Sequence, residues 1–306
     1  MTRTIRSFLL LGAALAAGAA PAAARAQSER SRVDTTFAFG KNGTVDLGIV
    51  SGDISVTGWT RAEAKVNAFV ERGTLDVSLS SSHIGIALRS RRNNMGDSRY
   101  ELMVPIGTRV TAHSVSGEIR IKATAGEVDV NSVSGDIEVL DATERVHINT
   151  VSGNAHVAKV RGNLRFEGVS GDLEAEDITG DLDTHTVSGE ITVRGARAAR
   201  VRSETVSGNI TYVGSMEANG TYDFSAHSGD VKLEIPGGTG ASLSLQSFSG
   251  EVSSRFPMTL QPGQNTSRRN RKMEFTINGG GARVTVQTFS GDITIDRGAS
   301  RSNKED

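Results

Sequence analysis

The sequence predicts an all-β fold, a parallel β-solenoid with two short strands in each coil of about 18 residues. Three observations predict it. The dipeptide Ser-Gly recurs at regular intervals, apolar and polar residues alternate between its copies, and the chain combines 35 glycines with an aromatic content of only 5%. Such a composition is typical of many short strands joined by turns rather than of a core of large side chains.

The Ser-Gly dipeptide marks one position in each repeat. Five copies follow one another at a constant interval, the later copies are spaced more widely, and the last interval is about twice as long as those before it. An isolated early copy stands at Ser51-Gly52. The regular copies are Ser116-Gly117, Ser134-Gly135, Ser152-Gly153, Ser170-Gly171 and Ser188-Gly189, and the later ones are Ser207-Gly208, Ser228-Gly229, Ser249-Gly250 and Ser290-Gly291. A fixed internal period of this length indicates stacked repeats.

Within the regular region the period halves to nine residues. Glycine begins most of these nonamers, Glu144 being the exception, and positions three, five and eight are apolar, as in Gly135-Asp-Ile-Glu-Val-Leu-Asp-Ala-Thr143. Side chains alternate along a strand, so positions three and five share a face, and position eight joins them only if the chain bends in between. Each nonamer therefore predicts one strand and one corner, which favours a flattened two-sided coil over three sides of six residues.

Stacked coils place equivalent residues above one another. We therefore expect continuous interior columns made by one valine from each coil, together with the apolar residue at position three. The predicted columns contain Val133, Val151, Val169 and Val187, with Ile119, Ile137, Leu173 and Ile191. The corner glycines are expected where a side chain would point inward or the backbone needs a positive φ.

Residues 1–26 predict a cleaved signal peptide. Arg3 and Arg6 precede an apolar run at 8–20, and Ala24-Arg25-Ala26 follows it. A signal anchor is the alternative. No second membrane segment is evident, so we expect export to the periplasm or the cell surface.

The remaining chain divides into three parts. Residues 27–110 predict an irregular N-terminal β part that caps the solenoid, with a separate sandwich domain as the alternative. Residues 111–298 predict the regular solenoid, interrupted by a polar loop at 259–272, and residues 299–306 predict a disordered tail. The loop carries Arg268, Arg269, Arg271 and Lys272, which can contact anionic lipid or polysaccharide, although a solvated hairpin is the simpler interpretation.

Composition excludes several classes of function. The chain has no cysteine, which excludes disulfides, thiolate metal sites and a lipid-attached N-terminal cysteine. Without the three arginines of the signal peptide, 31 of the 34 basic residues face 35 acidic ones. A net charge of about −4 gives no electrostatic argument for nucleic acid. The oligomeric state stays open.

The sharpest candidate site is a histidine between two carboxylates. Residues 18 apart form an outward column, and in it His156 lies between Glu138 and Glu174, a pattern that can bind a metal or carry out acid–base chemistry. The same charges also form an ordinary cross-strand ladder, which we favour because exposed carboxylates on a sheet are usually solvated. The whole column is Arg120, Glu138, His156, Glu174 and Thr192, and the opposite face repeats the alternation at Asp129, His147, Arg165 and Asp183.

A polar residue follows each corner glycine. It is a candidate ligand rail, but its commoner role is turn chemistry, because Asp and Asn bond locally to the backbone. The stacked Ser-Gly hydroxyls have the same explanation. No nucleophile elbow, zincin histidine pair or calcium-binding Gly-Gly-x-Gly-x-Asp unit is present, so we predict no catalytic residue, cofactor or metal ligand. The rail residues are Glu118, Asp136, Asn154, Asp172 and Glu190.

Several of these motifs resemble a bacterial family of β-strand repeats named "putative adhesins", of unknown function. The matching segments are the recurrent Val-Ser-Gly-Asp-Ile, Ser51-Gly-Asp-Ile-Ser-Val-Thr-Gly-Trp59, Met103-Val-Pro-Ile-Gly107 and the Gly279-Gly-Gly segment. The resemblance implies an exported β-helix-like protein without catalytic residues. We therefore predict a noncatalytic adhesin or cell-envelope scaffold whose partners are surface polysaccharide or envelope components. The alternative is a polysaccharide-binding or polysaccharide-degrading β-helix protein.

Overall fold

The computed structural model describes residues 31–89, 96–257, 259–260 and 272–298. The predicted signal peptide at 1–26, most of the polar loop and the tail at 299–306 lie outside the described residues. Among the residues described, every regular element is a β-strand, which confirms the all-β class. No helix in this part of the chain is long and apolar enough to cross a bilayer.

The described strands follow one another along the chain. They are β1 (Arg32–Ala38), β2 (Thr44–Trp59), β3 (Glu63–Val70), β4 (Thr74–Leu79), β5 (His83–Arg89), β6 (Ser98–Pro105), β7 (Arg109–Lys122), β8 (Val128–Ser134), β9 (Ile137–Leu140), β10 (Val146–Ser152), β11 (Ala155–Ala158), β12 (Leu164–Ser170), β13 (Leu173–Glu176), β14 (Leu182–Ser188), β15 (Ile191–Ser207), β16 (Ile210–Ser228), β17 (Val231–Pro236), β18 (Ala241–Ser249), β19 (Val252–Ser254), β20 (Thr259–Leu260), β21 (Lys272–Ile277), β22 (Ala282–Ser290) and β23 (Ile293–Gly298).

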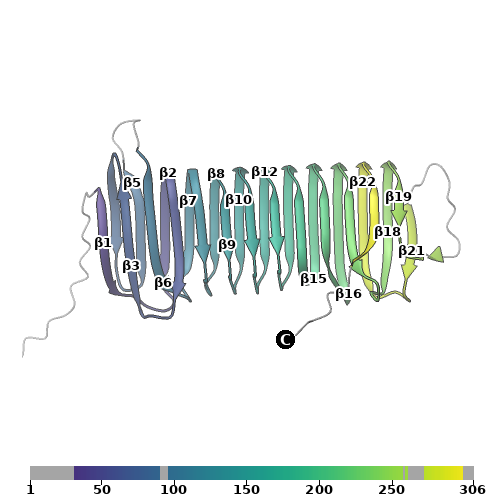
Figure 1. The fold of residues 1–306 in the computed structure, drawn as a ribbon, viewed down its shortest axis with the longest axis horizontal. Helices are drawn as coiled ribbons and strands as arrows, with labels where there is room; N and C mark the ends of the chain where they lie inside the picture. Colours follow the sequence, from purple (N-terminus) through teal and green to yellow (C-terminus); the bar gives the residue numbers. More distant parts are fainter. Residues whose placement is uncertain (1–30, 90–95, 258, 261–271, 299–306) are drawn as a thin grey trace, which may run out of the picture.

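The strands stack side by side along a rod in two rows (Figure 1). The first row contains β8, β10, β12 and β14, and the second contains β9, β11 and β13. Pairing within each row is parallel, and each residue pairs with its equivalent in the next coil, as Val128 does with Val146 and Ile137 with Ala155. One coil thus contributes one strand to each row.

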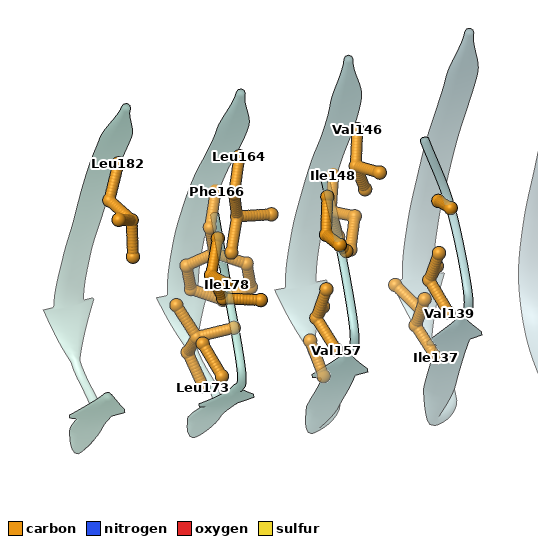
Figure 2. Packing of buried hydrophobic residues seen from close by; sticks show 14 of the residues in the cluster. Ile137, Val139, Val146, Ile148, Val157, Leu164, Phe166, Leu173, Ile178 and Leu182 are labelled. Carbon is orange, nitrogen blue, oxygen red and sulfur yellow. The ribbon is translucent and has the colours of Figure 1, made fainter. Parts of the chain in front are cut away.

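The core lies between the two rows. Figure 2 shows apolar side chains from successive coils pointing into this space, among them Ile137, Ile148 and Phe166. The predicted inward positions of Ile119, Ile137, Leu173 and Ile191 are confirmed, because each side chain is no more than 1% exposed. A large side chain in one coil is followed by smaller ones in the next coils of the same buried column. Phe166 is followed by Thr184 and then Ser203, and the buried hydroxyls of these two residues are 2.8 Å apart.

The predicted interior valine column is wrong. Val133, Val151, Val169 and Val187 lie over one another at adjacent rungs, but they face outward and are 40 to 49% exposed. In this half of the coil the strand runs straight through position eight: β8 buries Val128, Val130 and Ser132, so alternation turns Val133 away from the core.

The other half of the coil does bend before position eight. Asp141, Lys159 and Asp177 take positive φ values of 55°, 56° and 51° just after β9, β11 and β13. That turn brings the next residue back to the core, where Ala142, Val160 and Ile178 are fully buried. The two nonamers of a coil are therefore not equivalent.

The Ser-Gly corner requires glycine because neighbouring corners almost touch. A Cβ on Gly153 would lie 2.2 Å from the carbonyl oxygen of Gly135, and the same approach recurs from Gly117 through Gly229. Gly153 also has φ of +148°, a conformation that L side chains rarely adopt. A side chain anywhere in this column must push two coils apart.

Both ends of the rod place coils out of sequence order. At one end, β2 lies between β7 and the pair β5 and β6, so Ser51 pairs with Ser116. At the other end, the last coil enters between two earlier ones: β22 pairs with both β16 and β18, and Ser290 lies between Ser228 and Ser249. The early and late Ser-Gly copies therefore belong to the same column.

Antiparallel strands close most of the row ends. In the first row β4 pairs with β5, and β21 pairs with β18. In the second row β3 pairs with β6, and β1 pairs with β3, while the far end is the three-residue strand β19. Reversed or very short end strands interrupt the parallel template that another chain would otherwise extend.

Replacing a corner glycine should destabilise the protein strongly. For Gly153→Val we expect a loss of at least about 3 kcal/mol, because the side chain meets backbone in a strained conformation. Glu138→Ala, on the outer surface of the second row, should cost no more than about 1 kcal/mol. Thermal melts of the two variants check this, and equal melting temperatures would refute the corner assignment.

All three tyrosines of the chain are buried, and burial raises their pKa values. The pKa of Tyr100 rises to about 12, and those of Tyr212 and Tyr222 also rise above 10.0. The Tyr100 hydroxyl donates to the Gly48 carbonyl at 3.3 Å. Because folding favours the neutral phenol, this stabilisation is complete below pH 10 and is lost as pH rises toward the folded-state values.

We therefore expect stability to fall above pH 10 by up to about 1.4 kcal/mol per pH unit for each buried tyrosine. Denaturation curves between pH 9 and 12, read together with phenolate absorbance, measure this fall. Tyr100→Phe should reduce the slope. Phenolate formation at pH 10 without any loss of folded structure would contradict the prediction.

Candidate functional site

The most unusual surface of the molecule is a line of exposed apolar side chains on the first row. Nine stacked residues, which we call the outer ladder, precede the Ser-Gly corner in successive coils, and the partly exposed Val50 continues the line beyond them at the early Ser51-Gly52 corner. Of the eleven large apolar side chains that are exposed in the described part of the chain, eight belong to it. In order along the rod the ladder is Val115, Val133, Val151, Val169, Val187, Val206, His227, Phe289 and Phe248.

The ladder ends in a stack of three rings. Phe289 lies between His227 and Phe248, with ring centroids 4.9 and 4.8 Å apart and planes within 9° and 5° of parallel. The spacing is that of adjacent strands, so the inserted β22 supplies the middle ring. Phe248 is 63% exposed, the largest exposure in the ladder.

An open groove runs alongside the ladder, on the side away from the Ser-Gly corner. One stretch has a volume of 660 Å³ and runs from Val115 to Val187, and a second of 470 Å³ continues from His185 to Phe248. The far wall is a column of polar side chains two residues before the ladder. This polar wall consists of His113, Asn131, Asn149, Glu167, His185, Glu204, Ser225, Gln287 and Gln246.

Hydrogen bonds within and between coils hold the polar wall. The Asn149 amide donates to the Asn131 Oδ1 at 3.0 Å, and the Asn131 amide donates to Asp129 at 2.6 Å. Farther along, the His185 Nδ1 lies 3.3 Å from a carboxylate oxygen of Glu204. The groove thus has one apolar wall and one wall that donates and accepts hydrogen bonds.

The predicted column around His156 forms ion pairs on the outer face of the second row. The His156 Nδ1 is 3.6 Å from Glu174, while Glu138 is engaged by Lys122 at 3.1 Å and Arg120 at 3.8 Å. Arg194 also holds Glu174 at 3.0 Å. The two carboxylates therefore do not converge on His156. In the described residues no group of three or more metal-ligating side chains is found.

The column on the first row behaves in the same way. His147 lies 3.4 Å from Asp129, and Arg165 lies 3.4 Å from Asp183 and also binds Glu167. The guanidinium pKa of Arg165 is raised by its hydrogen bond to Glu167 and by the two nearby carboxylates. Both columns are ladders in which acidic and basic side chains of neighbouring coils pair with one another.

Six of the Asp and Asn residues that follow a corner glycine accept a backbone N–H, but the bond is not local as predicted. The Asp136 side chain accepts the backbone N–H of Asn154 at 3.1 Å, Asn154 accepts that of Asp172 at 3.2 Å, and Asp172 accepts that of Glu190 at 2.8 Å. The same bond joins Asn209 to Asp230 and Asp230 to Asp292. The rail therefore connects coils rather than shaping a single turn.

Other sequence candidates have separate positions. The corner serines Ser116, Ser134 and Ser152 are exposed in a line beside the ladder. Trp59, at the end of β2, donates to the Glu63 carbonyl at 2.7 Å and lies under Arg61. Of the basic loop only Lys272 is described, and it pairs with Glu274 at 2.9 Å. None of these residues joins the groove.

The geometry defines a class of protein: an all-β, solenoid-like repeat protein with a flat outer surface and a linear groove. The chain belongs to the family described as Toastrack DUF4097, whose model matches residues 41–296. A comparison with curated proteins finds no match.

Several solved structures are similar over most of their length. A "putative lipid binding protein" from Parabacteroides distasonis has a TM-score of 0.49 at 12% identity, covering 88% of this chain and 97% of that one. A "putative adhesin" from Bacteroides fragilis has a TM-score of 0.36 at 12% identity, with coverages of 86% and 96%. A "putative cell adhesion protein" from Clostridium sporogenes has 0.25 at 10%, with 87% and 100%. These values are too low to transfer a ligand to this chain.

Loss of one rail acceptor should cost a measurable amount of stability. We expect Asp172→Ala to lose about 1 kcal/mol, because the Glu190 N–H then has only solvent as a partner. Asp172→Asn should remain near the parent protein, since Asn154 and Asn209 already accept the equivalent bond. Thermal denaturation compares the three chains, and an Asn variant as unstable as the Ala variant would contradict the rail.

Proposed function

We propose that this protein is a noncatalytic exported adhesin or cell-envelope scaffold that acts through the outer ladder and its groove. The observation that carries the proposal is one outward position that is apolar at eight of nine successive rungs. Monomeric soluble proteins rarely leave an apolar surface of this extent exposed, and such surfaces are usually interaction sites.

The charge geometry supports a noncatalytic role. An active site needs titratable groups that converge in a pocket with perturbed pKa values. Here the charged residues of both outer faces pair along flat columns, as Glu138 does with Lys122 and Arg165 does with Asp183. The described side chains whose pKa shifts most are buried tyrosines of the core rather than groove residues.

Export is supported by the sequence. The basic, apolar and small-residue order of residues 1–26 is that of a signal peptide. A chain without cysteine has no disulfide to form after export. Packing and backbone hydrogen bonds hold the rod together, so its stability outside the cytoplasm does not depend on disulfides.

Polysaccharide binding is the competing function, and the groove gives it one specific argument. Sugars present apolar C–H faces and hydroxyl groups, which suit a groove with valines on one wall and the amides of Asn131 and Asn149 on the other. A degrading enzyme would also need an acid and a base beside the sugar. The carboxylates that line the groove, Glu167 and Glu204, are each bound by an arginine of the same strand, and the Glu138 and Glu174 column lies on the other row.

A binding screen tests the proposed function. The exported chain is incubated with isolated envelope fractions and a glycan panel, and both retention and sugar release are measured. We expect retention without release, unchanged in Glu138→Ala and Glu174→Ala. Retention should fall at least tenfold when Val151→Lys and Val169→Lys are combined, and Thr192→Lys, which adds a lysine to the other row, is the matched control.

Two results would overturn the proposal. Saturable sugar turnover that disappears in Glu138→Ala or Glu174→Ala would make the protein an enzyme. Retention that the ladder variant and the Thr192→Lys control reduce equally would remove the ladder from function.

A further inference from the structure

We propose that the outer ladder is the interface of a homodimer in which two copies pack antiparallel, with the two-fold axis between the Val151 and Val169 rungs. The inference deepens the proposed function, on which it rests, by naming the partner of the ladder as a second copy of this chain. Three properties of the ladder carry it: its area, its period and its symmetry.

The area is sufficient for association. The six facing valines, at 40 to 49% exposure, leave roughly 450 Å² in one stripe, which is within the ~300–600 Å² of the largest patch on a typical monomer. Adding the polar wall brings each copy near the ~800 Å² per partner of a standard interface. A two-fold contact uses the same surface on both copies, so one stripe supplies both sides.

The period selects the partner. Ladder side chains repeat at the strand spacing of about 4.8 Å, and Phe289 and Phe248 show it directly with centroids 4.8 Å apart. A second rod has the same repeat by construction, so every rung meets an equivalent rung. An extended peptide advances about 6.6 Å for each pair of residues and loses register within a few rungs.

The symmetry fixes the orientation. The six exposed valines are centred between Val151 and Val169, so an antiparallel copy pairs Val115 with Val206, Val133 with Val187, and Val151 with Val169. The partly exposed Val50, at the rung beyond Val115, then meets His227. A parallel copy would also match valines. In that arrangement, however, each polar-wall residue would face either the same residue of the second copy or the corner serines.

The polar wall is complementary in the antiparallel arrangement. Its residues meet as His113 with Glu204 and Asn149 with Glu167, where a donor faces a carboxylate. Asn131 meets His185, and an amide can donate to or accept from an imidazole. Glu167 and Glu204 are already bound by Arg165 and Arg202 within one copy, so only a further donor is needed.

The next column is neutral rather than attractive. There Asp129 faces Asp183 of the second copy, but within its own copy Asp129 is paired with His147 and Asp183 with Arg165. Each aspartate that faces another across the dimer is thus already paired with a basic side chain of its own copy. The acidic rail lies past the corner, outside the facing surface.

Sedimentation velocity of the exported chain over a concentration series tests the association. We expect a dimer, and we expect Val151→Lys or Val169→Lys to weaken it at least 100-fold, because each buries two unpaired ammonium groups at the centre. Thr192→Lys is the control and should leave it unchanged. Circular dichroism and melting temperatures of the variants show that they remain folded.

A spin label tests the orientation. The chain has no cysteine, so Ser116→Cys, in the corner beside the ladder, takes a single label. In the antiparallel dimer the two labels lie five rungs apart along the rod, which predicts a separation of about 25–30 Å. A parallel dimer would place the two labels on the same rung, within about 20 Å of each other.

Each outcome decides the inference. A monomer at all concentrations, a dimer that both lysine variants retain, or a label separation in the range of the parallel dimer overturns it. A monomer that envelope fractions still retain through the ladder would sink this inference and leave the proposed function standing. A dimer that no envelope fraction or glycan retains would do the reverse.

Discussion

The close approach of successive Ser-Gly corners is the constraint on which the whole structure depends. The carbonyl oxygen of each corner glycine occupies the space that a side chain on the next would need, 2.2 Å from the Cβ position at Gly153. The coils therefore stack in one register, with the rail bond from Asp136 to Asn154 beside the corner. Every other column, buried or exposed, inherits this register.

A fixed register makes the surface as repetitive as the core. A single outward position, repeated in each coil, becomes a continuous apolar line, and charged positions become ladders that neutralise themselves. Val151 and Val169 have the same surroundings as their neighbours, so the ladder acts as a linear surface rather than as a pocket. Such a surface suits a partner that is itself long and repetitive, which links the scaffold function to self-association.

Sequence reasoning found the features that depend on local alternation. The inward places of Ile119 and Ile137, the corner glycines and the charge ladder around His156 all follow from a period of two within a strand and of 18 between coils. The valine ladder was assigned to the wrong side because the two nonamers bend at different places. The signal in the sequence is incomplete: position seven is Asp141 or Lys159 where φ is positive and the β-branched Thr150 where the strand continues. In the next coil, however, the strand continues through Gly168. The insertion of β2 and β22 between other coils depends on long-range pairing, which spacing alone does not encode.

The order of the coils along the rod tests the central claim most directly. Two corner serines at a time are replaced by cysteine and spin-labelled, and the labelled protein is diluted in unlabelled protein so that only distances within one chain are measured. The pairs join Ser116 to Ser228, Ser290 and Ser249. A single glycine column with the last coil inserted predicts about 29, 34 and 38 Å, increasing in that order at about 4.8 Å per rung. A distance to Ser249 shorter than that to Ser290 would mean that the coils follow the chain order, and the account would be contradicted.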